Sequence, residues 1–261
     1  MFSHERLKVY DKTLASVANL ARCSALWDKR HCVVDHLIRA SESIVLNLAE
    51  GARLWSSGQK QHSLDYAVGS ALESAACLDI AVLKQFLPAD SALCEKRLLC
   101  EIVKMLVGLR KSWGKAHLHE DSANYHIQSD YLFPHERLDV YQVSLDFMRW
   151  FQALPAGAEL SNRLYRQIDK AATSVVLNIA EGNGRYPNAD RRRFLDIAEA
   201  CAVKAAAYLD LGVRKAELDP NQREGGIQLL GRIALMWRGL SLRFRIELPS
   251  RFPRQFDKVC D

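Results

Sequence analysis

Apolar residues recur along this chain at the spacing of packed helices. In one stretch they fall at steps of 0, 3, 7, 10 and 14, namely at Leu99, Ile102, Leu106, Leu109 and Trp113. The same steps return at Leu230, Ile233, Trp237, Leu240 and Phe244. A stripe of this period is typical of helices that cross at a shallow angle in a bundle. The pattern therefore predicts bundled helices, and no two-residue alternation typical of strands interrupts it.

The two stripes belong to an internal repeat with an offset of 131 residues. Residues 2–113 align with residues 133–244 without a gap, and 34 of the 112 aligned positions are identical. The run Asn-Leu-Ala-Glu-Gly at 47–51 returns as Asn-Ile-Ala-Glu-Gly at 178–182. Two copies of one pattern predict two domains of one architecture, so each copy can test an interpretation of the other.

Each copy reads as four helices separated by short polar breaks. Ser-Ser-Gly at 56–58 and Pro-Asn-Ala-Asp at 187–190 separate the second helix from the third. Connections this short favour antiparallel neighbours. We therefore predict an all-α fold of two tandem antiparallel up-down-up-down four-helix bundles at 1–113 and 133–244. Residues 114–132 are the predicted linker, and residues 245–261 form a basic C-terminal tail.

Two of the helical patterns carry more specific expectations. In the first helix, the apolar stripe that we expect to be buried comprises Leu7, Tyr10, Leu14 and Val17. The third helix is rich in small residues, which in the two copies are Ala67, Ala71, Ala75 and Ala76, and Ala198, Ala202, Ala206 and Ala207. Because small side chains let helix axes approach closely, this helix is a candidate for pairing one bundle with another, within or between chains.

Composition places the chain among ordinary globular proteins, with 49% hydrophobic and 26% charged residues. The net charge of +5 is unevenly divided. Residues 1–130 carry 16 basic and 15 acidic residues, a net +1, whereas residues 131–261 carry 20 and 16, a net +4. This balance permits an anionic partner without requiring one.

Seven cysteines without a C-x-x-C pair favour reduced thiols. No apolar leader begins the sequence and no run of 18 apolar residues occurs in it. We therefore expect a cytoplasmic protein that has no membrane partner.

The sharpest local feature is the repeated Asn-x-Ala-Glu-Gly element. Its asparagine and glutamate are three residues apart and share a helical stripe beside the apolar one. Such groups need partners if they are buried. The expected polar network comprises Asn47, Glu50, Asn178 and Glu181, with Arg6 and Arg137 as partners. The favoured interpretation is that this network fixes the register of each bundle, and the alternatives are a ligand or partner site and, last, catalysis.

Motifs that would indicate an enzyme are missing from the sequence. Neither copy repeats a His/Asp/Glu set at metal-ligand spacing, and there is no Glu-x-x-His of the di-iron type and no phosphate-binding loop. The repeat pairs only His4 with His135, and both are interpreted as surface or capping residues. We expect no catalytic activity, no cofactor and no metal site.

Basic residues form the candidate nucleic-acid contacts. Three consecutive arginines fall in the first turns of the third helix of the second copy, and the tail interleaves basic and aromatic residues. A solvated face and a contact with a phosphate backbone both remain open for these residues. The candidates are Arg53, Lys60, Arg185, Arg191, Arg192, Arg193, Arg251 and Arg254.

A family resemblance adds to this interpretation. It is carried by the run at 178–182, by Gly-Arg at 184–185, by Arg-Phe-Leu at 193–195, by the upstream Gln-Ile-Asp-Lys-Ala-Ala-Thr-Ser at 167–174, and by the Glu-Arg-Leu-x-Val-Tyr start of both copies. These residues resemble the four helix bundle proteins encoded by intervening sequences in bacterial 23S rRNA genes. That family includes the accessory variability determinant of diversity-generating retroelements. The resemblance implies a non-enzymatic basic bundle that forms rings of five, and for the retroelement members binding to a reverse transcriptase and to nucleic acid.

The chain departs from this family in its tandem organisation, so the five-fold assembly does not carry over. The first copy also has His36 in place of Gln167, and Ala-Arg-Leu at 52–54 in place of Asn-Gly-Arg at 183–185. Two hypotheses follow. The first is an accessory protein that binds RNA or DNA, or a reverse transcriptase, mainly through its second copy. The second is an oligomeric protein-interaction scaffold that self-associates bundle to bundle without binding nucleic acid.

Overall fold

The computed structural model describes residues 2–113, 131–154, 160–185 and 188–246. Within these ranges the chain forms eight α-helices and two 3-10 turns, with no strand. The first bundle contains η1 (Ser3–Arg6), α1 (Lys8–Ser24), α2 (Cys32–Arg53), α3 (Ser57–Leu83) and α4 (Ala89–Trp113). The second contains η2 (Pro134–Arg137), α5 (Asp139–Gln152), α6 (Asn162–Asn183), α7 (Asn188–Arg214) and α8 (Pro220–Ile246).

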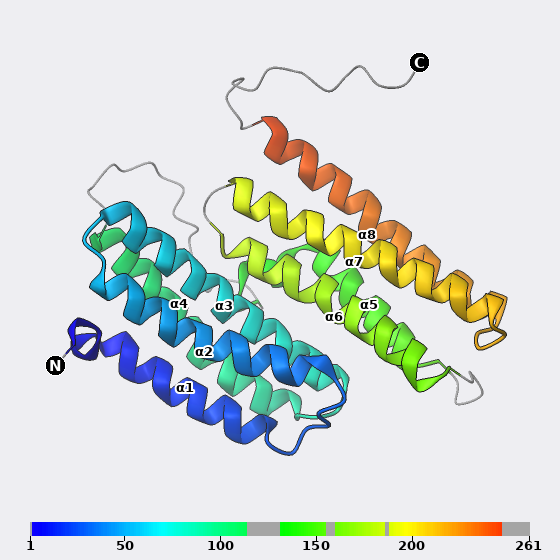
Figure 1. The fold of residues 1–261 in the computed structure, drawn as a ribbon, viewed down its shortest axis with the longest axis horizontal. Helices are drawn as coiled ribbons and strands as arrows, with labels where there is room; N and C mark the ends of the chain where they lie inside the picture. Colours follow the sequence, from blue (N-terminus) through cyan, green and yellow to red (C-terminus); the bar gives the residue numbers. More distant parts are fainter. Residues whose placement is uncertain (1, 114–130, 155–159, 186–187, 247–261) are drawn as a thin grey trace.

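Each set of four helices closes into a bundle. The first helix packs against the second and the fourth, and the third packs between the second and the fourth, in both copies (Figure 1). The predicted stripe of α4 lies in the core, since Leu99, Ile102 and Leu106 are fully buried. The matching Leu230 and Ile233 of α8 are also buried. The predicted fold of two tandem four-helix bundles is therefore confirmed.

The predicted buried face of the first helix is wrong for the first copy. Leu14 is 44% exposed, whereas Thr13 and Ser24 are buried on α1. Their hydroxyls donate to the carbonyl oxygens of Val9 and Leu20, at 2.7 and 2.8 Å, which satisfies these polar groups inside the core. A stripe defined by apolar residues alone misses a face built from small residues with satisfied hydroxyls.

The same turn ends the third helix of each copy. Gln85 and Ala216 occupy equivalent positions and both have positive φ, 58° and 57°. After each of them, the next backbone N–H donates back to a carbonyl five residues earlier, Phe86 to Ala81 and Glu217 to Gly212. The two copies thus share the geometry of this helix end although neither uses glycine there.

The two bundles pack against each other along α3 and α6, which lie side by side at the centre of the molecule (Figure 1). Contacts of α2 with α6 and of α3 with α5 flank this central pair. We call this surface the seam. Because α3 packs inside its own bundle and also against the second one, 16 of its residues are buried. Within the chain α3 is thus the helix that joins the two bundles, whereas association between chains through the small-residue helices stays a prediction.

The length and composition of α3 also pass a simple test for a membrane-spanning helix. Its 18-residue window has a mean hydropathy of 1.4, and 72% of that window is buried. It is the one helix of the described residues that passes. Its place between two bundles accounts for its apolar character and is consistent with a soluble protein, while the cytoplasmic location stays a prediction.

Candidate functional site at the seam between the bundles

A pair of glycines brings the two bundles into backbone contact at the seam. A Cβ atom at Gly184, which caps α6, would lie 2.8 Å from the Cα of Gly69 on α3. Real Cβ atoms do not approach backbone this closely, so a side chain at Gly184 would force the helices apart. The second member, Gly69, faces the guanidinium of Arg185, which a Cβ would approach to 3.1 Å.

Arg185 fills the space beside these glycines. It is 3% exposed, and its guanidinium lies over the rings of Tyr66 on α3 and Phe194 on α7, with 4.0 and 4.8 Å between the Cζ atom and the ring centroids. It also pairs with Glu181 one helical turn earlier. A cation between two aromatic faces and beside a carboxylate is a stable internal arrangement. This burial corrects the expectation that Arg185 contacts a phosphate at the surface.

A second polar cluster crosses the seam near the start of α2. Lys84 at the end of α3 pairs with Asp169 on α6, and their side chains are only 3% and 5% exposed. The Nδ1 atom of His31 lies 3.1 Å from both the Oδ2 atom of Asp169 and the Nζ atom of Lys84. Burying these charges costs several kcal/mol per ion unless they are paired, so each holds the other in place.

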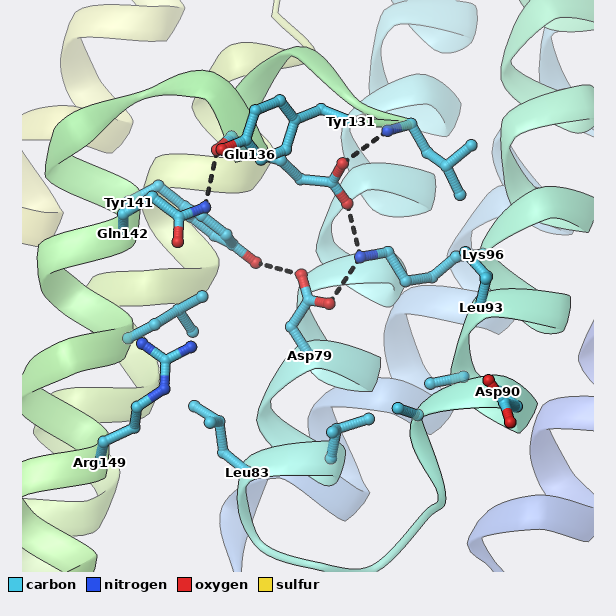
Figure 2. A pocket seen from close by; sticks show the side chains of 15 residues that line it. Asp79, Leu83, Asp90, Leu93, Lys96, Tyr131, Glu136, Tyr141, Gln142 and Arg149 are labelled. Atoms are coloured by element: carbon cyan, nitrogen blue, oxygen red, sulfur yellow. Dashed lines mark hydrogen bonds and ion pairs between the residues drawn. The ribbon is translucent and has the colours of Figure 1, made fainter. Parts of the chain in front are cut away.

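A third cluster joins α3 and α4 to the second bundle (Figure 2). The Nζ atom of Lys96 lies 2.6 Å from Asp79 Oδ1 and 2.5 Å from Glu136 Oε1. The hydroxyl of Tyr141 donates to Asp79 Oδ2 at 2.8 Å. Glu136 Oε2 accepts two bonds from backbone N–H groups, those of Leu132 and Phe133. Burial is the main cause that raises the pKa of Asp79.

His135 lies next to this third cluster, fully buried. Its ring stacks on Phe133 and meets the edge of Tyr141, with centroid distances of 5.6 and 4.7 Å. Its burial corrects the interpretation of His135 as a surface or capping residue. The equivalent His4 has the same aromatic neighbours, Phe2 and Tyr10, but stays partly exposed. The turn η2, which carries His135, lies at the seam, whereas η1, which carries His4, packs within the described residues only against its own bundle.

A groove of about 540 Å³ opens along the seam, lined by α2, α3, α6 and α7. Acidic and basic side chains both line it, together with His36: Arg39, Glu73, Glu181, Arg185, Asp190 and Arg193. His36 lies 3.1 Å from Glu73. Burial raises the pKa of Glu181, and the nearby Glu73 carboxylate adds to this rise. The groove is therefore polar and electrically mixed, without the single sign of charge that a phosphate site needs.

The Asn-x-Ala-Glu-Gly element serves mainly to pack helices. A Cβ at Gly51 would lie 3.2 Å from Ser63 Cβ, and one at Gly182 would lie 2.9 Å from Phe194 Cβ, so both glycines let the second helix approach the third. The amides of the two asparagines donate back along their own helices. Asn47 donates to the carbonyl of Ser43 and Asn178 to that of Ser174, four residues earlier.

The expected arginine partners of the motif glutamates do not contact them in the described structure. Arg6 and Arg137 are exposed, and neither forms an ion pair with a motif carboxylate. Glu181 pairs with Arg185 instead, and Glu50 is exposed on α2. The prediction of this pairing was wrong because the 3-10 turns η1 and η2 leave these arginines at the surface.

The remaining candidate nucleic-acid contacts are scattered in the structure. Arg193 is exposed at the rim of the groove, and Arg192 lies 3.9 Å from Asp196 on its own helix. Lys60 covers the ring of Trp113 at 5.1 Å. Among the others, Arg191 is half-buried, Arg53 is exposed, and Arg251 and Arg254 lie outside the described residues, as do most of the predicted linker and tail.

The seam roles of three residues were missed in the sequence, although the repeat carries a signal for them. Each is a polar residue where the other copy has an apolar one. Asp169 corresponds to Ile38, Lys96 to Ile227, and Arg185 to Leu54. At these three positions, the replacement of an apolar residue by a polar one coincides with a contact that only this copy makes.

Comparison with known proteins places the chain in a family. The family model described as 23S rRNA-intervening sequence protein matches residues 5–108 and again residues 136–239. No curated protein and no solved structure matches the chain. The two matched segments coincide with the two bundles and together cover most of the sequence. The chain therefore belongs to the 23S rRNA-intervening sequence protein family, as a tandem of two copies.

Proposed function

We propose that this chain is a non-enzymatic assembly scaffold in which α7 of one copy packs against α2 of the next. The observation that carries the proposal is a set of exposed apolar residues on these two helices. The equivalent positions in the other repeat lie on α3 and α6, which pack against each other at the seam. The seam inside the chain is therefore the template for a second contact between chains.

On α7, three large apolar residues face solvent. Val203 is 61% exposed, Leu211 47% and Ile197 38%. Of their counterparts on α3, Leu72 and Ile80 are fully buried. Since each pair sits at the same place of the same bundle architecture, the second bundle is what covers α3. No such partner covers α7 within the described part of the chain.

The face of α2 that corresponds to the seam side of α6 is likewise apolar. Leu46 is 67% exposed and Ile38 is 41% exposed. Their counterparts Leu177 and Asp169 are 2% and 3% exposed at the seam. Because Ile38 replaces an aspartate that pairs with Lys84, this α2 face is more apolar than the matching face of α6. Covering such residues removes apolar surface from water and is favourable by about 25 cal/mol per Å².

Charge complementarity also favours the α7–α2 pairing. At the groove of the seam, Glu73 on α3 and Glu181 on α6 carry like charges close enough to raise the pKa of Glu181. Their counterparts are Lys204 on α7 and Glu50 on α2, which carry opposite charges, and both are exposed. The proposed contact therefore brings a lysine near the motif glutamate that lacks an ion pair within the described chain.

The second contact is not an identical copy of the seam. Ala200 and Arg53 replace the glycine pair Gly69 and Gly184, so the α7 and α2 backbones lie farther apart than those of α3 and α6. The two faces differ from each other, which makes the contact head-to-tail. Such contacts build a ring if the rotation closes and a filament if it does not.

The mass of the full chain in solution tests this proposal. We expect light scattering to give a multiple of 29.5 kDa. Leu46→Glu and Val203→Glu each place a charge in the contact and should each give a single chain. Each variant keeps one intact face, so mixing the two should restore one contact and give a pair of about 59 kDa, twice the chain mass.

Leu235→Glu is the matched control, because Leu235 on α8 is 68% exposed and lies on neither face. It should leave the assembly unchanged. A monodisperse single chain of the natural sequence contradicts the proposal. A symmetric α2–α2 contact would show itself differently. Leu46→Glu would disrupt it, whereas Val203→Glu would still pair with itself, and the mixture would form no pair that contains both variants.

Nucleic-acid binding is the second candidate function, favoured by the exposure of Arg193 and the weak pairing of Arg192 in the first turns of α7. Binding to a structured RNA and to single-stranded DNA should weaken steeply with salt if phosphates are contacted, because counterions are released. Absence of binding at low salt would remove this candidate. The reverse transcriptase partner implied by the family resemblance stays a prediction, which co-purification of the two proteins would test.

A further inference from the structure

The third cluster of the seam contains a buried histidine whose hydrogen-bonding capacity is unused. Both ring nitrogens of His135 are buried and neither has a hydrogen-bond partner among the described residues. A neutral imidazole has one donor and one acceptor, and leaving either unmet in a buried place costs about 1–3 kcal/mol. Contacts with the rings of Phe133 and Tyr141 explain the place of the imidazole, but not the choice of a residue with two polar atoms.

Two carboxylates lie beside this imidazole. Single ligand atoms from Asp79, His135 and Glu136 all lie within 4.8 Å of one another. Asp79 comes from α3 of the first bundle, whereas His135 and Glu136 come from η2 of the second. Metal-ligand spacing along the sequence could not reveal this set, because its members come from different copies of the repeat.

The charges of the cluster do not balance. Asp79 and Glu136 each carry a negative charge when ionised, and Lys96 supplies one positive charge between them. With both carboxylates ionised, the single ammonium group of Lys96 leaves one negative charge without a partner of opposite sign in this largely buried cluster, where such a charge is costly.

We propose that Asp79, His135 and Glu136 bind one divalent first-row transition-metal ion, in exchange for the ammonium group of Lys96. A divalent ion neutralises both carboxylates and binds a nitrogen of His135. It therefore compensates the excess negative charge and also gives the buried imidazole a partner. One imidazole nitrogen with two carboxylate oxygens suits Zn²⁺ or its neighbours in the first row, whereas sites for Mg²⁺ are built from oxygens.

The surroundings leave room for the exchange. Lys96 lines a cavity of about 410 Å³ together with Asp79, Glu136 and Tyr141, and its side chain can turn into that space when it leaves the carboxylates (Figure 2). Hydrogen bonds already orient the ligands, from Tyr141 to Asp79 and from two backbone N–H groups to Glu136. Outer contacts of this kind fix metal ligands in place. The bound ion would join the two bundles.

The test uses the full chain after treatment with a chelator. Co²⁺ is added as a probe read by its visible absorption, and Zn²⁺ is added in a calorimeter, with one site per chain expected from both. His135→Phe keeps an aromatic ring in the slot but removes both nitrogens, and it should abolish that site. His4→Phe makes the same change in the first copy, away from Asp79 and Lys96, and should leave binding unchanged.

Lys96→Met removes the competing ammonium and should tighten binding by about 10- to 100-fold, the range over which neighbouring groups change metal affinity. Failure of the natural chain to bind overturns the proposal, and binding by Lys96→Met alone does so too, since Lys96 is then the resident cation. Binding that persists in His135→Phe also overturns it, because the ion would then sit elsewhere, for example on cysteines. Far-UV circular dichroism of each variant shows that the helices remain intact.

Discussion

The helices α3 and α7 are equivalent in the repeat, but they differ in how much of their outer face is buried. Leu72 and Ile80 on α3 are fully buried, while the equivalent Val203 and Leu211 on α7 are 61% and 47% exposed. Both helices pack the same way inside their own bundles. The comparison therefore shows that docking of the second bundle buries this face of α3, and that the face of α7 with the same place in the repeat lacks such a cover within the described residues.

The largest expected effect comes from breaking a pair that only the seam contains. Lys84→Met leaves Asp169 buried without its ammonium partner, and it should lower the free energy of unfolding by about 3–5 kcal/mol. The equivalent Lys215, just after α7, is exposed, so Lys215→Met should cost less than about 0.5 kcal/mol. Denaturant titration of both variants measures the difference, and equal effects would mean that the seam does not bury Lys84.

A smaller effect is expected where the bundles touch through backbone. Gly184→Ala places a Cβ 2.8 Å from Gly69 Cα and should destabilise the chain by about 1–3 kcal/mol, the usual cost of overpacking. A Cβ added at Gly231 on α8 would have no neighbouring atom within 4 Å, so Gly231→Ala should instead stabilise by up to about 1 kcal/mol. Thermal unfolding that shifts in the same direction for both variants would contradict the close approach at the seam.

The two copies also differ in the pH dependence of stability that their equivalent histidines, His135 and His4, are expected to cause. Its folded-state pKa lies well below 6.5 because of burial, so at lower pH the unfolded chain binds a proton that the folded chain does not. Stability must then fall as pH drops below 6.5, by at most about 1.4 kcal/mol per pH unit from this one group. Burial raises the pKa values of Asp79 and Glu181. These two acids therefore lower the stability as pH rises above their unfolded-state pKa values, which is the opposite of the effect of His135.

The contribution of His135 is isolated by comparing variants. His135→Phe should flatten the fall in stability as pH drops from about 6.5 to about 5, whereas His4→Phe should leave its slope unchanged. The readout is the denaturant midpoint at each pH for the natural chain and the two variants. An unchanged slope in His135→Phe would show that another group causes the fall.

The sequence predicted the inside of each bundle better than the contact between bundles. Stripes such as the one at Leu99 and Ile102 identify a core because their period reflects the helix itself. The buried face of α1 escaped because Thr13 is polar by type, although its hydroxyl is satisfied by its own helix. Asp169 and Lys96 could not be assigned partners, since no local spacing links residues that meet only after two bundles dock.

The candidate arginines show the same division within a short stretch. Arg185 and Arg193 were predicted to act together, but tertiary packing separates them. The space beside Gly69 takes Arg185 inside, between two aromatic rings, while the start of α7 leaves Arg193 at the surface. A count of basic residues along the sequence cannot distinguish an internal cation from a surface one.

The smallest expected effect on stability sharpens this last contrast. Replacing Arg192 and Arg193 together with Ala should change the free energy of unfolding by no more than about 0.5 kcal/mol, because neither side chain is buried. If the pair binds phosphates, the slope of log affinity for single-stranded DNA against log salt should fall by about 0.7 for each phosphate that the variant no longer neutralises. Lys215→Met is a control that removes one exposed charge at the far end of α7. An equal change of slope per charge removed in that control would mean that only net charge matters, and the first turns of α7 would then have no special part in binding.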